Sequence, residues 1–260
     1  MIVHLMDAKT LFEEELLKRG HKFNIEEDTG LYCIEQEGMT LRLNLENLAR
    51  EYAGGGMPER VSQYLDHMLS GTSIKDVKVT AESLYWSLES NNHGKSQVIR
   101  IPVSEKTDRV LVRLIPELGA IVWVDEESLQ AAGLLDFEAE AEAYINLDTA
   151  AHDATVGYSE IDGIRLGYLN SSVPFTSSLI LAPNFRALVE PVLGWPVYAV
   201  TPTRDIVFIW YAGHKGFEER VGPIVVQKFL NASYPISTEV YEITDGSVRV
   251  AGEFATNSAG

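Results

Sequence analysis

The stretch Val197-Tyr-Ala-Val-Thr-Pro-Thr-Arg-Asp-Ile-Val-Phe-Ile-Trp210 holds the clearest fold signal in the chain. Two apolar runs, 197–201 and 206–210, flank a short polar turn, and residues 216–230 behind them place apolar residues at helical spacing. Val, Ile, Tyr and Trp favour strands, and a short turn joins antiparallel neighbours. We therefore predict a β-hairpin followed by a helix.

The same order of elements occurs twice more along the chain. The segments are 31–36, 40–45 and 58–70 in the first copy, and 109–114, 120–124 and 136–147 in the second. Identity between the copies is poor, so either common local packing or an ancient duplication accounts for them. The repeated hairpin-then-helix units predict an α+β fold, with antiparallel or mixed sheets flanked by helices.

The length of 260 residues allows one large domain or two smaller ones. We expect an N-terminal α+β lobe over residues 1–71, an irregular connecting region over 72–107 and a C-terminal α+β lobe over 108–254. Residues 255–260 should form a tail. A single domain is the alternative organisation.

Charge and composition exclude several classes of protein. The chain has 38 Asp and Glu against 21 Lys and Arg, a net charge of -17, so a phosphate backbone would repel most of its surface and we expect no nucleic-acid partner. No apolar stretch is long enough for a membrane span, and the N-terminus lacks the pattern of a signal peptide. We therefore expect a soluble cytoplasmic protein without a membrane partner.

The residues that usually carry cofactor or metal chemistry are sparse. Cys33 is the only cysteine, which excludes a cysteine-rich zinc site, and it lies in an apolar strand pattern that predicts a buried thiol. No two of the six histidines have the spacing of helical metal ligands. Gly94-Lys95-Ser96 is no phosphate-binding loop, because Glu89 stands where that motif needs glycine. We expect no metal and no cofactor.

The turn Pro202-Thr-Arg-Asp205 is the most interesting polar segment, because it places an arginine beside an aspartate between two strands. A rigid turn and a ligand-facing loop are both consistent with it. The candidate binding residues are Thr203, Arg204, Asp205, His214 and Ser178. A catalytic alternative would bring Asp205 to His214 or His152, near the segments of Asp153 and Ser178.

Four segments resemble an uncharacterised bacterial family, common in Bacillus-type genomes and described only as a domain of unknown function. They are Met39-Thr-Leu-Arg-Leu-Asn-Leu-Glu-Asn-Leu-Ala-Arg-Glu-Tyr52, Gly119-Ala-Ile-Val-Trp-Val-Asp125, Pro202-Thr-Arg-Asp-Ile-Val-Phe-Ile209 and Tyr234-Pro-Ile-Ser237. The resemblance spans roughly residues 12–254 and implies a cytosolic α+β fold, with no activity attached. The chain departs from the family at Thr203 and Arg204, where the family has His and Gln. Ser178 is retained in a stretch whose acidic residues and arginine are missing here.

Three functions follow as hypotheses. The leading one is a non-enzymatic binding or interaction protein, whose partner is a protein or a small-molecule ligand. The alternative is a hydrolase-like enzyme with its site near Asp153, Ser178 and Asp205. The net charge alone motivates a third, an acidic immunity-type protein that neutralises a basic partner.

Overall fold

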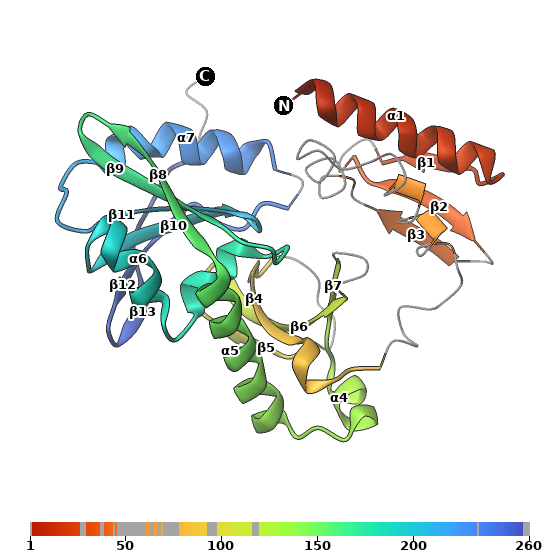
Figure 1. Cartoon of the computed structure of the whole chain (residues 1–260), viewed down its shortest axis with the longest axis horizontal. Coiled ribbons are helices and arrows are strands. Elements are labelled where there is room, and N and C mark those ends of the chain that lie inside the picture. Colours follow the sequence, from red (N-terminus) through yellow and green to blue (C-terminus); the bar gives the residue numbers. More distant parts are fainter. Residues whose placement is uncertain are drawn as a thin grey trace. The chain divides into compact units, whose positions relative to one another are not determined.

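The structure is a computed structural model of the whole chain (Figure 1). It describes residues 2–26, 30–36, 39–43, 45, 61–62, 65–66, 69, 78–92, 98–115, 120–232 and 234–256. Helices and three antiparallel sheets make up this part of the chain, so the predicted α+β class is confirmed. The chain divides into two compact units, residues 1–78 with 116–119 and residues 79–115 with 120–260.

The first unit packs a helix on a small antiparallel sheet. Its elements are α1 (Ile2–Lys18), β1 (Phe23–Ile25), β2 (Tyr32–Gln36) and β3 (Met39–Leu43), with strand order β1-β2-β3. Phe12 and Leu16 of α1 are buried together with Tyr32 and Ile34 of β2. Cys33 is buried, as its strand pattern predicts.

The helix predicted for the first unit lies partly outside the described residues. In the helix predicted over 58–70, the described residues 61–62, 65–66 and 69 are helical. Val61 and Leu65 belong to the core of this unit, which agrees with the apolar stripe that predicted the helix.

The second unit contains a six-stranded antiparallel sheet with strand order β13-β12-β10-β11-β9-β8. Its strands are β8 (Thr155–Ile161), β9 (Ile164–Asn170), β10 (Val197–Thr203), β11 (Ile206–Tyr211), β12 (Glu239–Thr244) and β13 (Ser247–Glu253). The turn between β8 and β9 has positive φ at both Asp162 (52°) and Gly163 (79°), the backbone of a type I′ turn. The pair Asp162-Gly163 is of the kind that favours this turn.

The second sheet of this unit is built around β6 (Thr107–Ile115). β4 (Leu84–Ser90) pairs with one edge of β6 along seven residues, while β5 (Arg100–Pro102) and β7 (Ala120–Trp123) pair with its other edge. A short 3-10 turn, η2 (Ala81–Ser83), precedes β4. Residues 84–90 thus form a regular strand within the region expected to be irregular. Six of its seven residues are buried, so the alternation that marks a half-exposed strand is missing.

The remaining elements of this unit are α4 (Glu126–Ala132), α5 (Asp136–Asp153), η4 (Thr176–Leu181), α6 (Phe185–Leu193) and α7 (Glu218–Leu230). Two apolar clusters lie on opposite faces of β11. Val207 and Ile209 belong to the larger cluster, with α5, η4 and α6, while Trp210 belongs to the cluster under α7. This double cover explains why β11 is apolar on both faces, as predicted for a central strand.

Helix α5 buries one stripe of small and apolar residues, Ala139, Ala143, Leu147 and Ala151. It packs on β4, and Asn146 donates hydrogen bonds to the carbonyl oxygens of Ala81 (2.9 Å) and Leu84 (2.8 Å). Leu135 takes the N-cap position, and Asp136 lies in the first turn. A carboxylate in the first turn interacts favourably with the positive end of the helix dipole. Within the described ranges, no helix has both the length and the apolar character needed to cross a membrane.

Candidate functional site

The predicted turn between β10 and β11 points its arginine into the second unit. The guanidinium of Arg204 donates two hydrogen bonds to the carboxylate of Glu89 on β4, from Nε (3.1 Å) and Nη2 (2.8 Å). Its Cζ atom lies over the Tyr234 ring, 4.5 Å from the ring centre. The Glu89 side chain is only 2% exposed, and Ser87 Oγ donates a further hydrogen bond to it (2.7 Å). Arg204 therefore joins two sheets.

Ser178 lies beside this ion pair but has a structural role. Its side chain is fully buried in η4, and its hydroxyl accepts a hydrogen bond from the backbone N–H of Leu88 (2.8 Å). The preceding residue, Ser177, donates its backbone N–H to the carbonyl oxygen of Arg204 (2.9 Å). The structure thus brings two predicted site segments together. The Ser178 hydroxyl satisfies an edge N–H of β4, a group that would otherwise be buried without a partner.

The other candidate residues do not gather at this place. Asp205 and His214 lie beyond opposite ends of β11, whose six residues span about 17 Å. His214 contacts Tyr211 edge-on at 5.4 Å between ring centres. His152 and Asp153 are exposed at the C-terminal end of α5. The hydroxyl of Thr203 is buried and has no hydrogen-bond partner in the described part of the chain.

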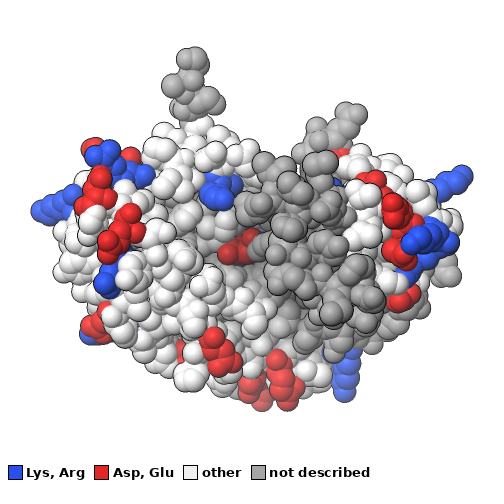
Figure 2. All heavy atoms as spheres, turned by 45° about the horizontal axis from the view of Figure 1, so that its top comes forward, with Lys and Arg blue, Asp and Glu red and all other residues white. Residues whose placement is uncertain are grey.

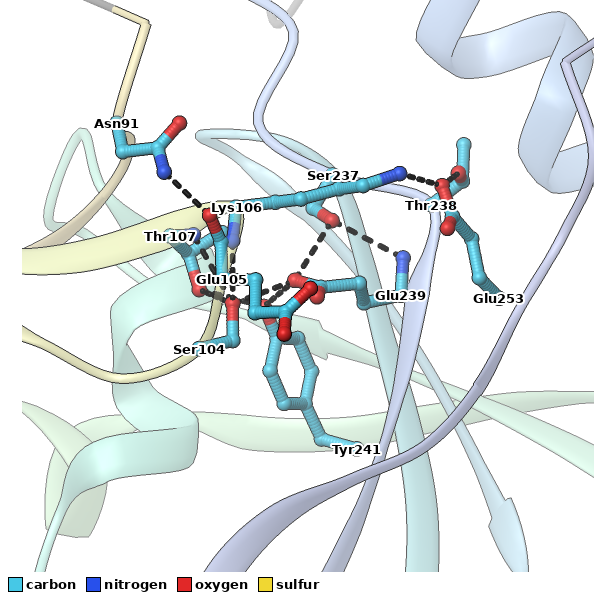
Figure 3. A network of polar contacts seen from close by, with 10 residues as sticks. All are labelled: Asn91, Ser104, Glu105, Lys106, Thr107, Ser237, Thr238, Glu239, Tyr241 and Glu253. Carbon is cyan, nitrogen blue, oxygen red and sulfur yellow. Dashed lines mark hydrogen bonds and ion pairs between the residues drawn. The ribbon is translucent and has the colours of Figure 1, made fainter.

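A second polar cluster was not predicted from the sequence (Figure 3). The buried carboxylate of Glu239, the first residue of β12, accepts hydrogen bonds from three hydroxyl groups. The donors are Ser104 Oγ (2.6 Å), Tyr241 OH (3.1 Å) and Ser237 Oγ (3.2 Å). The hydroxyl of Thr107 lies 2.8 Å from that of Ser104 and 2.7 Å from that of Tyr241. This hydroxyl network links the start of β6 to β12.

The surroundings of Tyr241 favour the protonated form of its hydroxyl. Burial is the main cause that raises the pKa of the Tyr241 hydroxyl, and the charge of Glu239 raises it further, against hydrogen bonds from Thr107 and Ser104 that lower it. Beside the network, Lys106 pairs with Glu253, and this ion pair lowers the pKa of Glu253. The three donors to the Glu239 carboxylate are all neutral hydroxyls. The cluster therefore holds a buried carboxylate through hydrogen bonds, which is how polar groups are accommodated inside proteins.

In both polar clusters the central carboxylate already accepts hydrogen bonds from other side chains. The carboxylate of Glu89 is bound by Arg204 and Ser87, and that of Glu239 by three hydroxyls. Among the residues that the structure describes, no group of three or more His, Cys, Asp or Glu could hold a metal ion. The buried polar groups consequently fasten the two sheets of the second unit to each other.

A cavity of about 550 Å³ lies between the start of α6 and the turn from β12 to β13. Its size is within the range of ligand sites. Arg186 lines it, but its guanidinium pairs with Glu190 (2.8 Å) and Asp245 (2.8 Å). The cation is thus already neutralised, and none of the predicted site residues lines the cavity.

The outer face of α5 combines exposed apolar side chains with an excess of acidic ones. Leu135, Phe137 and Ile145 are 56%, 68% and 57% exposed, and Ala141 lies exposed between the last two. Residues 125–153, which include α4 and α5, contain nine Asp or Glu and neither Lys nor Arg. Several acidic side chains lie along the lower edge of the view in Figure 2, the edge at which Figure 1 places these helices. We call this surface the α5 face.

Comparisons with models of protein families, with curated proteins and with solved structures found no match to this chain.

Proposed function

We propose that the protein is a non-enzymatic binding protein and that the α5 face contacts a protein partner. The observation that carries this proposal is the exposure of Phe137 and Ile145 on a helix whose opposite stripe already covers the core. These side chains do not stabilise the fold where they are. Burying a side chain of this size on binding is worth about 1.5–3 kcal/mol, which makes the pair suitable anchors for a partner.

The polar interior supports the same proposal. A hydrolase built on Ser178 needs a base at hydrogen-bond distance from the hydroxyl, and this hydroxyl instead accepts the N–H of Leu88. Arg204 is engaged with Glu89 and is therefore not a free anchor for a small anionic ligand. No observation of comparable weight favours an enzyme.

The test is a comparison of partner capture by three immobilised proteins in lysate of the native cells. They are the unaltered protein, the double variant Phe137→Ser with Ile145→Ser, and a control double variant, Tyr158→Ser with Val250→Ser. The control residues are also exposed but lie on β8 and β13. We expect mass spectrometry to find a protein that the unaltered and control proteins retain and the α5 variant loses.

Equal retention of each captured protein by the α5 variant would contradict the proposal. The hydrolase alternative is tested in parallel with ester and amide substrates and the variant Ser178→Ala. Turnover that depends on Ser178 would also overturn the proposal, because it would show that this hydroxyl reacts.

A further inference from the structure

We infer that the partner of the α5 face is a basic amphipathic helix. This inference rests on the proposed function and names the chemistry of its partner. Its starting point is charge: nine carboxylates and no Lys or Arg occur between residues 125 and 153. Elsewhere in the second unit acidic side chains meet arginines, as in the pairs Arg186–Glu190 and Arg249–Glu242.

The carboxylates flank an apolar row. Phe137, Ala141 and Ile145 follow each other at intervals of four residues, which places them along one side of α5. Glu138 and Glu142 each lie one residue further along the chain, about 100° around the helix. Glu140 lies on the other flank. The α5 face therefore combines an apolar stripe with negative borders.

Glu140 and Glu142 have no hydrogen bond or ion pair within the described residues. The carboxylates of two other residues of α5 are already hydrogen-bonded. Glu138 accepts the backbone N–H of Leu135 (3.3 Å), and Asp148 accepts two hydrogen bonds from Asn184. Two carboxylates beside the stripe are thus available for cations of a partner. A helix with apolar residues at intervals of three and four and Lys or Arg beside them complements both the stripe and its borders.

The length of α5 and the negative charge of the α5 face favour a basic helix over other partners. The eighteen residues of α5 extend about 27 Å, enough for a partner helix of several turns. A second copy of this chain brings another net charge of -17 and the same acidic face, so like charges would oppose self-association there. Nucleic acids and anionic membrane surfaces are repelled for the same reason.

The experiment measures binding of three synthetic peptides of about 18 residues, a length matched to α5. The first is helical, with Leu at intervals of three and four and Lys elsewhere; the second has Glu in place of Lys, and the third has Ser in place of Leu. Fluorescence anisotropy is recorded at about 0.05 M and about 0.5 M salt. We expect the Leu/Lys peptide to bind, more weakly at high salt, and the other two to bind at least about tenfold less tightly.

Matched charge variants then locate the binding surface. Glu140→Gln, Glu142→Gln and Asp153→Asn remove three charges from α5, while Glu105→Gln, Glu160→Gln and Glu219→Gln remove three from elsewhere in the second unit. Each ion pair between a surface carboxylate and a peptide lysine changes the affinity only a few-fold. The loss of three carboxylates should therefore make the α5 variant bind the Leu/Lys peptide roughly tenfold more weakly. The control should keep its affinity within about twofold, and all variants should keep the same circular dichroism spectrum.

Equal weakening by both charge variants, or equal binding of the Lys and Glu peptides, would overturn the inference. So would equal binding of the Ser/Lys peptide, because charge alone would then suffice. Failure of the proposed function is distinguishable. If lysate capture depends on Phe137 and Ile145 but the charge variants have no effect, the binding function stands and only the basic helix is wrong.

Discussion

Arg204 and Glu89 form the most consequential pair of single residues in the second unit. Removing one partner of a buried ion pair typically costs about 3–5 kcal/mol, because the other charge stays buried without compensation. We therefore expect Arg204→Met to lower the free energy of unfolding by about that amount, measured by urea denaturation. Arg186→Met is the matched control: Arg186 also binds carboxylates but is half exposed, so solvent screens its ion pairs and its loss should destabilise the protein far less. Equal losses for the two variants would contradict the account.

Tyr241 gives a prediction about pH at the same scale. Burial raises the pKa of its hydroxyl above that of an unfolded chain, so folding favours the protonated form. The resulting stability is complete below a pH of about 10, the pKa of free tyrosine, and is lost as the pH rises towards the folded value. The free energy of unfolding should thus fall as the pH rises above about 10, and less steeply in Tyr241→Phe. The same slope in both proteins would show that Tyr241 does not contribute.

Whether a polar contact could be predicted from the sequence depends on how far apart its two residues lie along the chain. The turn containing Arg204 could be identified because proline and three polar residues separate two apolar strand patterns. Its partner Glu89 lies 115 residues away, and no local pattern reports such a pairing. The Glu239 network was missed for the same reason, since Ser104 and Glu239 are 135 residues apart. The polar turn was thus predictable from its own sequence, but the partners of its side chains, which lie far away along the chain, were not.

At the scale of elements, α5 offers a test of which stripe faces the core. Ala143 is fully buried and Ala141 is exposed, although they are only two positions apart. Ala143→Leu adds volume to a packed interior and should cost about 1–3 kcal/mol. Ala141→Leu should change the free energy of unfolding by no more than about 0.5 kcal/mol. Thermal unfolding of the two variants measures the difference, and a costly Ala141→Leu would show that the outer face is packed.

The hairpins were the elements best predicted from sequence. Asp162-Gly163 and Asp245-Gly246 each mark the turn of an observed hairpin, because the turn geometry depends on the two residues that form it. The sequence of residues 85–88 indicates an extended segment, but not the full length of strand β4. Its covering elements, α5 and η4, come from later segments, so its own sequence could not show that both of its faces would be buried.

At the scale of the whole molecule, the second unit has its own cores and two sheets joined by polar contacts. Independent cores are the mark of parts that can fold alone. We therefore expect a fragment of residues 79–260 to unfold in one cooperative transition and to keep the near-ultraviolet circular dichroism of packed aromatic rings. A broad transition without that signal would show that residues 1–78 are required for the second unit to fold.

The net charge of the chain predicts only part of what we propose for the α5 face. The net charge of -17 by itself suggests a basic partner, but charge does not say where a partner binds. The structure adds the location, because burial of Ala139, Ala143 and Leu147 turns Phe137 and Ile145 outward. Such orientation depends on which stripe of α5 packs on β4, and this is a property of the assembled unit.

The most direct measurement is an NMR titration of the isotope-labelled protein with the Leu/Lys peptide, following backbone amide shifts. The account predicts that the largest shift changes fall on α4 and α5, centred on Phe137, Ala141 and Ile145. Unchanged shifts there, with changes instead around residues 202–205 or around the cavity beside α6, would contradict it.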